Sequence, residues 1–225
     1  MPALQTGTQL TGAVTDLINA FLLLPLVFRL KKHLSREHVP SRLWRRLMTL
    51  LCVSNALGAV VHLFQWDFTG RFLIWFALYP MIFAVCNDFL RLALYSSSGG
   101  VHPRKKLNQG LNAALAVTWI LLMVLFLVRR DEPVRVFMVY TLVTVIPGFL
   151  FHIRLALRGH TGARLLLVAF LPLLFGAALM MLQTGSFVFI LPFDHNSIMH
   201  LFITFAIVIF YLSARSWEKE PVTIG

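Results

Sequence analysis

Apolar residues fill seven long runs of this chain, and most of its polar residues lie between those runs. A helix needs roughly 20 residues to cross the hydrocarbon core of a bilayer, and each run is about that long. The runs cover about residues 9–30, 43–66, 71–95, 107–128, 133–157, 163–184 and 195–214. The pattern predicts an all-α integral membrane protein in which a single domain, residues 1–225, forms a seven-transmembrane-helix bundle.

The composition agrees with a membrane protein and argues against an ordinary soluble domain. Hydrophobic residues make up 58% of the 225 residues and charged residues only 13%, whereas soluble domains carry about 25% charged residues. The mean hydropathy is +0.78. Because no basic residue precedes the first run, we expect a retained helix there and not a cleaved signal peptide.

The formal net charge of +11 is distributed in a way that predicts the orientation of the helices. Sixteen of the 20 Lys and Arg residues fall in segments that alternating spans place on one side of the membrane. Because loops rich in Lys and Arg stay in the cytoplasm, the N-terminus is predicted outside and the C-terminus in the cytoplasm. The basic excess is then a topology signal, and we expect no nucleic-acid partner.

Four of the ionisable residues within or at the ends of the predicted spans lie toward the outer side, and each needs a reason because such side chains are costly there. His62 lies near the outer end of the second span, and His195 and His200 open the seventh span from the outside. Asp16 lies about two helical turns down the first span. The sequence therefore predicts a polar site in the outer half of the membrane.

The three histidines suggest a metal site, because histidine is the commonest metal ligand. Three protein ligands and a water form the usual catalytic zinc arrangement, so we expect Zn²⁺ to be bound by His62, His195 and His200. His195 and His200 lie about 140° apart around an ideal helix. They fit one site if the helix begins at Asn196 or Ser197, because His195 could then turn inward from the cap. Each histidine could instead be an interfacial residue in contact with water.

Three further polar residues are candidates for catalysis beside the metal. Asp16 could act as general base or hold a ligand histidine, and Ser54 or Asn55 could stabilise a developing oxyanion. Residues 54 and 55 lie eight and seven positions before His62, so all three side chains share one helix face. A structural alternative for Asp16 is a buried hydrogen-bonded pair with Asn19, one turn further along the helix.

Three short motifs resemble those of the CREST superfamily of seven-helix membrane proteins, which includes alkaline ceramidases and adiponectin receptors. The motifs are Thr15-Asp16-Leu17, Ser54-Asn55-Ala56-Leu57-Gly58-Ala59-Val60-Val61-His62 and His195-Asn196-Ser197-Ile198-Met199-His200. They are most similar to small bacterial members of unknown function. The resemblance implies a zinc ion held by His62, His195 and His200, hydrolysis of a lipid amide or a related lipid bond, and a place in the bacterial inner membrane.

The chain differs from the superfamily pattern at three positions. Gly58 stands where the superfamily usually has serine, four residues before the histidine of the second helix. Asn196 stands where the first histidine of an i, i+4 pair is usual. Asp88 lies too close to the inner end of the third span to match the superfamily's aspartate, and its spacing predicts an i, i+3 ion pair with Arg91. A metal-free member of the superfamily is therefore an alternative.

Together these features predict a zinc-dependent membrane hydrolase, similar to the ceramidases, that acts on an amide or ester of a membrane lipid. The alternative is a non-enzymatic seven-helix sensor or receptor-like protein, in which the same histidines titrate or bind a metal or lipid without turnover. A transporter is disfavoured, because its polar residues would extend through the full thickness of the membrane.

Overall fold

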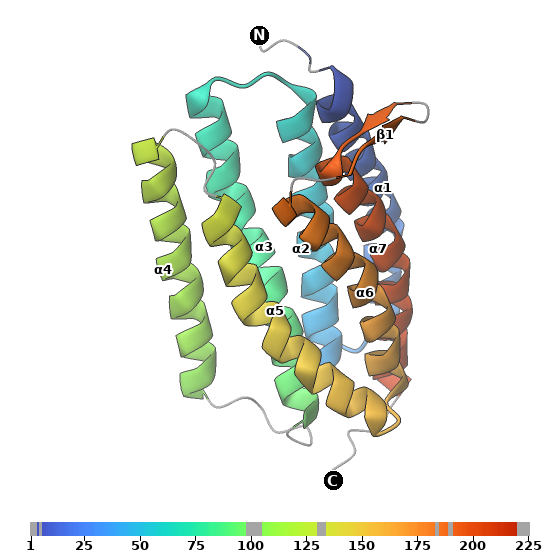
Figure 1. Ribbon diagram of the computed structural model, residues 1–225. Coiled ribbons are helices and arrows are strands. Elements are labelled where there is room, and N and C mark those ends of the chain that lie inside the picture. The colour runs from blue at the N-terminus through green and yellow to red at the C-terminus, as the bar shows by residue number, and fades with distance from the viewer. Residues whose placement is uncertain are drawn as a thin grey trace.

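The computed structural model describes residues 4, 6–97, 105–129, 134–182, 185–188 and 191–219, and most of these residues are helical. The helices are α1 (Gly7–His33), α2 (Val39–Leu63), α3 (Phe68–Ser97), α4 (Lys105–Arg129), α5 (Val134–Leu157), α6 (Thr161–Leu182) and α7 (His195–Lys219). Between α6 and α7, β1 (Phe187–Val188) pairs antiparallel with β2 (Pro192–Phe193). The predicted all-α, seven-helix bundle is confirmed for this part of the chain (Figure 1).

The helices match the predicted spans except at some of their ends. α2 begins at Val39, earlier than the predicted start near residue 43. Its second residue is Pro40, which fits the first turn of a helix because the N–H that proline lacks has no helical partner there. α1 continues through Lys31, Lys32 and His33, and the positive charges of the two lysines interact favourably with the C-terminal end of a helix.

The outer surface of the bundle is apolar, as expected for a protein surrounded by lipid. Phe21 on α1, Val117 on α4 and Val143 on α5 are 66%, 66% and 65% exposed. Soluble monomers rarely expose contiguous apolar patches of more than a few hundred Å². Each of the seven helices is also long and apolar enough to cross a membrane, so the fold indicates a membrane protein.

Aromatic side chains occupy the centre of the bundle in two clusters. In the larger cluster, the Trp44 ring of α2 lies 6.1 Å from the Phe89 ring of α3 and 6.2 Å from the Phe210 ring of α7. In the smaller cluster, the rings of Phe83 on α3 and Tyr140 on α5 lie 4.1 Å apart and pack with residues of α4. Among the described residues α4 contacts only α3 and α5, so it lies at the side of the bundle (Figure 1).

A buried ion-pair network joins α2 to α3 in the half of the bundle nearer the C-terminus. Asp88 is fully buried and accepts a hydrogen bond from Arg46 Nε at 2.6 Å and one from Arg91 Nη1 at 3.1 Å. A second Arg46 nitrogen, Nη2, donates to Asp88 Oδ1. The predicted pair of Asp88 with Arg91 is confirmed, and the contact with Arg46 makes it a link between helices.

We expect Asp88→Ala to destabilise the bundle, because it leaves the Arg91 side chain, which is only 11% exposed, without its carboxylate. Removing one partner of a buried ion pair costs up to about 5 kcal/mol, and the half-exposed Arg46 reduces the expected loss in free energy of unfolding to about 3 kcal/mol. Thermal unfolding in a mild detergent measures the loss. Glu37→Ala removes an exposed carboxylate outside the network and serves as the control, and equal losses in both variants would contradict the prediction.

Candidate metal centre

Helices α1, α2 and α7 meet near the end of the bundle where the N-terminus lies, and two glycines let them approach closely (Figure 1). A Cβ atom on Gly12 of α1 would lie 3.3 Å from Cγ of His62. A Cβ atom on Gly58 of α2 would overlap Oδ2 of Asp16. The His62 imidazole therefore packs against the backbone of α1, and the Asp16 carboxylate packs against the backbone of α2. Both approaches are possible because glycine has no Cβ.

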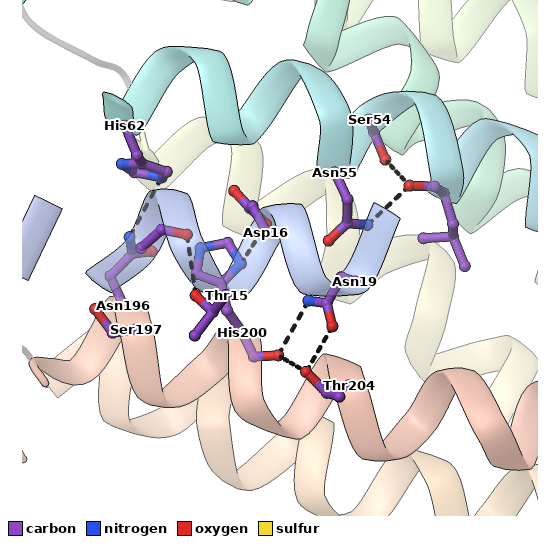
Figure 2. A network of polar contacts seen from close by, with 12 residues as sticks. Thr15, Asp16, Asn19, Ser54, Asn55, His62, Asn196, Ser197, His200 and Thr204 are labelled. Atoms are coloured by element: carbon purple, nitrogen blue, oxygen red, sulfur yellow. Dashed lines mark hydrogen bonds and ion pairs between the residues drawn. The ribbon is translucent and has the colours of Figure 1, made fainter. Parts of the chain in front are cut away.

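Three donor groups from these helices converge. One ligand atom from each of Asp16, His62 and His200 lies within 4.8 Å of the ligand atoms of the other two. His200 Nδ1 is 2.7 Å from Asp16 Oδ1, and the ring centroids of His62 and His200 are 5.6 Å apart (Figure 2). Asp16 is only 2% exposed, whereas both histidines are half-buried. The structure thus brings together two of the three predicted metal ligands and adds Asp16 to them.

The His62 ring is oriented by a residue that the sequence reasoning missed. Its Nδ1 atom lies 2.8 Å from Oε1 of Gln9, which can only accept a hydrogen bond, so this contact selects the tautomer of His62 with the proton on Nδ1. The other nitrogen, Nε2, keeps its lone pair and lies 3.4 Å from the amide nitrogen of Asn196. Gln9 comes seven residues before Asp16, and this two-turn spacing on one helix face is the signal that could have identified it.

His200 is held through its backbone by Asn19 and Thr204. Asn19 donates from Nδ2 to the His200 carbonyl at 3.2 Å, and the Thr204 hydroxyl lies 2.5 Å from Asn19 Oδ1 and 3.0 Å from the same carbonyl (Figure 2). The alternative in which Asn19 pairs with Asp16 is therefore not the observed arrangement. Asn19 instead joins α1 to α7 and leaves the Asp16 carboxylate to the histidines.

The donor types of these three side chains are those found at zinc sites. His200 Nδ1 is buried and makes no aligned hydrogen bond, although Asp16 Oδ1 is only 2.7 Å away. This contact is compatible with two atoms that direct lone pairs at one cation, and two imidazoles with a carboxylate form a known ligand set of catalytic zinc. A tetrahedral zinc ion would hold its donor atoms roughly 3.4 Å apart, so the contact between His200 Nδ1 and Asp16 Oδ1 would lengthen from 2.7 Å if zinc bound there.

His195 lies outside this group of converging donors, in contrast to the sequence-based prediction. α7 begins at His195 itself, because the Asp194 carboxylate caps the helix by accepting hydrogen bonds from the Ser197 backbone N–H and hydroxyl, both at 2.9 Å. His195 is therefore a helical residue about 140° around α7 from His200, and not a cap residue that can turn inward. Asp16 takes the third position in the cluster instead.

Ser54 and Asn55, the predicted oxyanion-stabilising residues, lie on α2 and make no hydrogen bond to the cluster in the described part of the chain. The Ser54 hydroxyl and the Asn55 amide both donate to the backbone carbonyl of Leu51, at 3.1 and 2.8 Å (Figure 2). The single O–H of Ser54 is therefore already engaged in a hydrogen bond within α2. One N–H of the Asn55 amide has no acceptor among the described residues.

The cap at Asp194 depends on the charge of its carboxylate. Burial, the largest single influence, would raise the pKa of Asp194, but the hydrogen bonds from Ser197 and the other favourable contacts together hold the pKa below its usual value. The neighbouring His195 and a hydrogen bond from Thr8 act in the same direction. The ionised form is therefore the form that stabilises the start of α7.

We expect Asp194→Ala to lower the free energy of unfolding by about 1 kcal/mol at neutral pH, because the cap of α7 is lost. The folded-state pKa lies below the unfolded value of about 3.9, so this contribution is present above pH 4 and is lost as the pH falls through the folded-state pKa. Urea unfolding of the wild type and the variant between pH 3 and 7 measures the difference. A gap that persists unchanged at pH 3 would show that the carboxylate is not its source.

The chain matches the description "Family of unknown function (DUF6962)" over residues 11–219 and belongs to that family. The matched region contains Asp16, His62 and His200. Comparisons with curated proteins and with solved structures find no match. The seven-helix architecture is compatible with a CREST-like fold.

Proposed function

We propose that this member of the DUF6962 family is a zinc-dependent membrane hydrolase that cleaves an amide or ester bond of a lipid. The observation that carries the proposal is the convergence of Asp16, His62 and His200 between α1, α2 and α7. Three protein ligands leave a fourth position of zinc open, as catalytic sites require. The resemblance to the CREST superfamily supports the same metal and the same class of substrate.

The surroundings of His62 also support a metal ligand. Histidines that bind metals usually donate their other ring N–H to a carbonyl or carboxylate, which fixes the ring and raises the basicity of the ligating nitrogen. The Nδ1–H of His62 donates to the Gln9 carbonyl oxygen in this way, at 2.8 Å. The lone pair on Nε2 is then the one directed toward the seventh helix, where the Asn196 amide contacts it and His200 lies nearby.

Zinc bound at this site would supply Lewis-acid polarisation of a substrate carbonyl and activation of water. Asp16 has one oxygen beside His200 and the other against Gly58. The first oxygen could bind the zinc ion, while the second could accept a proton and return it to the leaving group. Asn55 lies one turn before Gly58 on the same helix, and its free N–H is suited to stabilise a developing oxyanion.

The position of the site suits a substrate that arrives from the bilayer. Leu17 and Ile18 follow Asp16 directly, and they are 47% and 51% exposed on the apolar outer face of α1. A single helix, about 10 Å in diameter, therefore separates the carboxylate from surrounding lipid. On the topology predicted from the Lys and Arg distribution, the site lies on the extracytoplasmic side of a plasma membrane, which we propose to be bacterial.

Elemental analysis of the purified protein tests the ligand set. We expect about one zinc per chain in the wild type and loss of zinc in His62→Ala and His200→Ala, because each variant leaves only two protein ligands. His195→Ala is the matched control, since it removes a neighbouring histidine of α7 and should keep the zinc. Zinc lost from His195→Ala but retained by Asp16→Ala would show that the ligand set is the three histidines.

Lipid hydrolysis by the reconstituted protein tests the reaction. The measurement is the fatty acid released from a ceramide and from a phospholipid ester, detected by mass spectrometry. We expect His200→Ala to lower the rate more than about 100-fold and Gln9→Ala to lower it about 10- to 100-fold, because Gln9 orients a ligand. His195→Ala should keep the wild-type rate, and full activity in His200→Ala would refute the hydrolase.

A metal-free sensor or receptor-like protein is the second candidate, and one contact favours it. Asn196 stands where the superfamily usually has a histidine, and its amide lies 3.4 Å from His62 Nε2. A hydrogen bond thus partly satisfies the imidazole without a metal. In that case the wild type would contain no zinc, and lipid would raise its thermal unfolding midpoint without forming product.

A further inference from the structure

A cleft at the opposite end of the bundle is lined mainly by arginine and asparagine side chains. It is lined by residues of the first turns of α2, the last turns of α3 and the start of α4. These parts of the three helices lie toward the end of the bundle where the C-terminus lies (Figure 1). Its volume is about 430 Å³, and its lining includes Arg42, Arg46, Arg91, Asn108 and Asn112. This volume lies within the range of small-ligand sites.

The positive charge of the cleft is neutralised only in part. Asp88 accepts hydrogen bonds from Arg46 and Arg91, and so balances one of the three arginines. Arg91 is held on its other side by Asn108, whose Oδ1 lies 3.1 Å from Nε, and by Asn112, whose Oδ1 lies 2.6 Å from Nη2. Two positive charges therefore remain beside a rigid set of donors.

Arg42 carries one of these two charges, and its guanidinium is free to bind a ligand. It is exposed, and within the described ranges its side chain makes no hydrogen bond or ion pair. Arg46 follows four residues later on the same face of α2, and its Nη1 is also unbonded because only Nε and Nη2 contact Asp88. A fixed guanidinium beside a free one presents several N–H donors toward a single oxyanion.

We propose that this cleft binds a phosphate group through Arg42 and Arg46. Guanidinium groups match the oxygens of phosphate by paired hydrogen bonds, and they keep their charge at any physiological pH. The Lys and Arg distribution predicts that this end of the bundle faces the cytoplasm, where anionic lipids accumulate and bind basic pockets between helices. Val39 and Leu43 add apolar lining, which suits a lipid phosphate, although free phosphate offers the same chemistry.

Native mass spectrometry of the full-length protein in detergent tests the proposal. The probes are phosphatidylglycerol, zwitterionic phosphatidylcholine and inorganic phosphate. We expect phosphatidylglycerol to bind more tightly than phosphatidylcholine, and Arg42→Gln to weaken its binding about five- to tenfold, because one positive charge and its N–H donors are lost. Arg158→Gln removes an exposed arginine at the same end but outside the cleft, and it should bind as the wild type does.

The arms of the experiment separate the sources of the phosphate. Phosphatidylglycerol that stays bound in excess inorganic phosphate identifies a lipid headgroup, whereas displacement by millimolar phosphate identifies free phosphate, and both results support the site. Arg42→Lys keeps the positive charge but lacks the planar guanidinium with its paired N–H donors, so it should give an intermediate affinity. Equal affinities of the wild type and Arg42→Gln for every probe, or equal losses in Arg42→Gln and Arg158→Gln, would overturn the proposal.

Discussion

A charged side chain inside an apolar bundle must find a partner, and this constraint determines where the helices of this protein make polar contacts. Two carboxylates, Asp16 and Asp88, are almost completely buried. Asp88 joins α2 to α3 through Arg46, and Asp16 joins α1 to α7 through His200. The arginines satisfy the buried charge of Asp88, and both contacts fix the relative position of two helices.

The two carboxylates differ in the chemistry that their partners allow. Arginine stays charged at any physiological pH, so Asp88 is neutralised permanently and its role is structural. Imidazole can be neutral, so Asp16 beside His62 and His200 has a negative charge that a metal ion could balance. This difference makes the centre between α1, α2 and α7 the better candidate for chemistry.

The close packing of α1 on α2 explains why a residue without a Cβ stands at position 58. The Cβ of a serine at position 58 would overlap with Oδ2 of Asp16. Gly58 and the buried carboxylate of α1 are therefore compatible with each other, whereas a serine in α2 would displace that carboxylate. Asp88 of α3 is engaged with arginines in the other half of the bundle, so among the described residues Asp16 is the carboxylate that lies with the two histidines.

The sequence by itself determined the seven helices, because the apolar length needed to cross a bilayer is visible directly along the chain. It also identified His62 and His200, because depth in a membrane follows from counting residues along a helix. It did not show that Asp16, and not His195, lies with these two histidines, and it did not identify Gln9. Those choices depend on the residue at which α7 begins, on the rotation of each helix about its axis, and on a contact between residues 53 positions apart. Only the tertiary structure decided them, because the packing of α1 against α2 and α7 sets which side chains face one another.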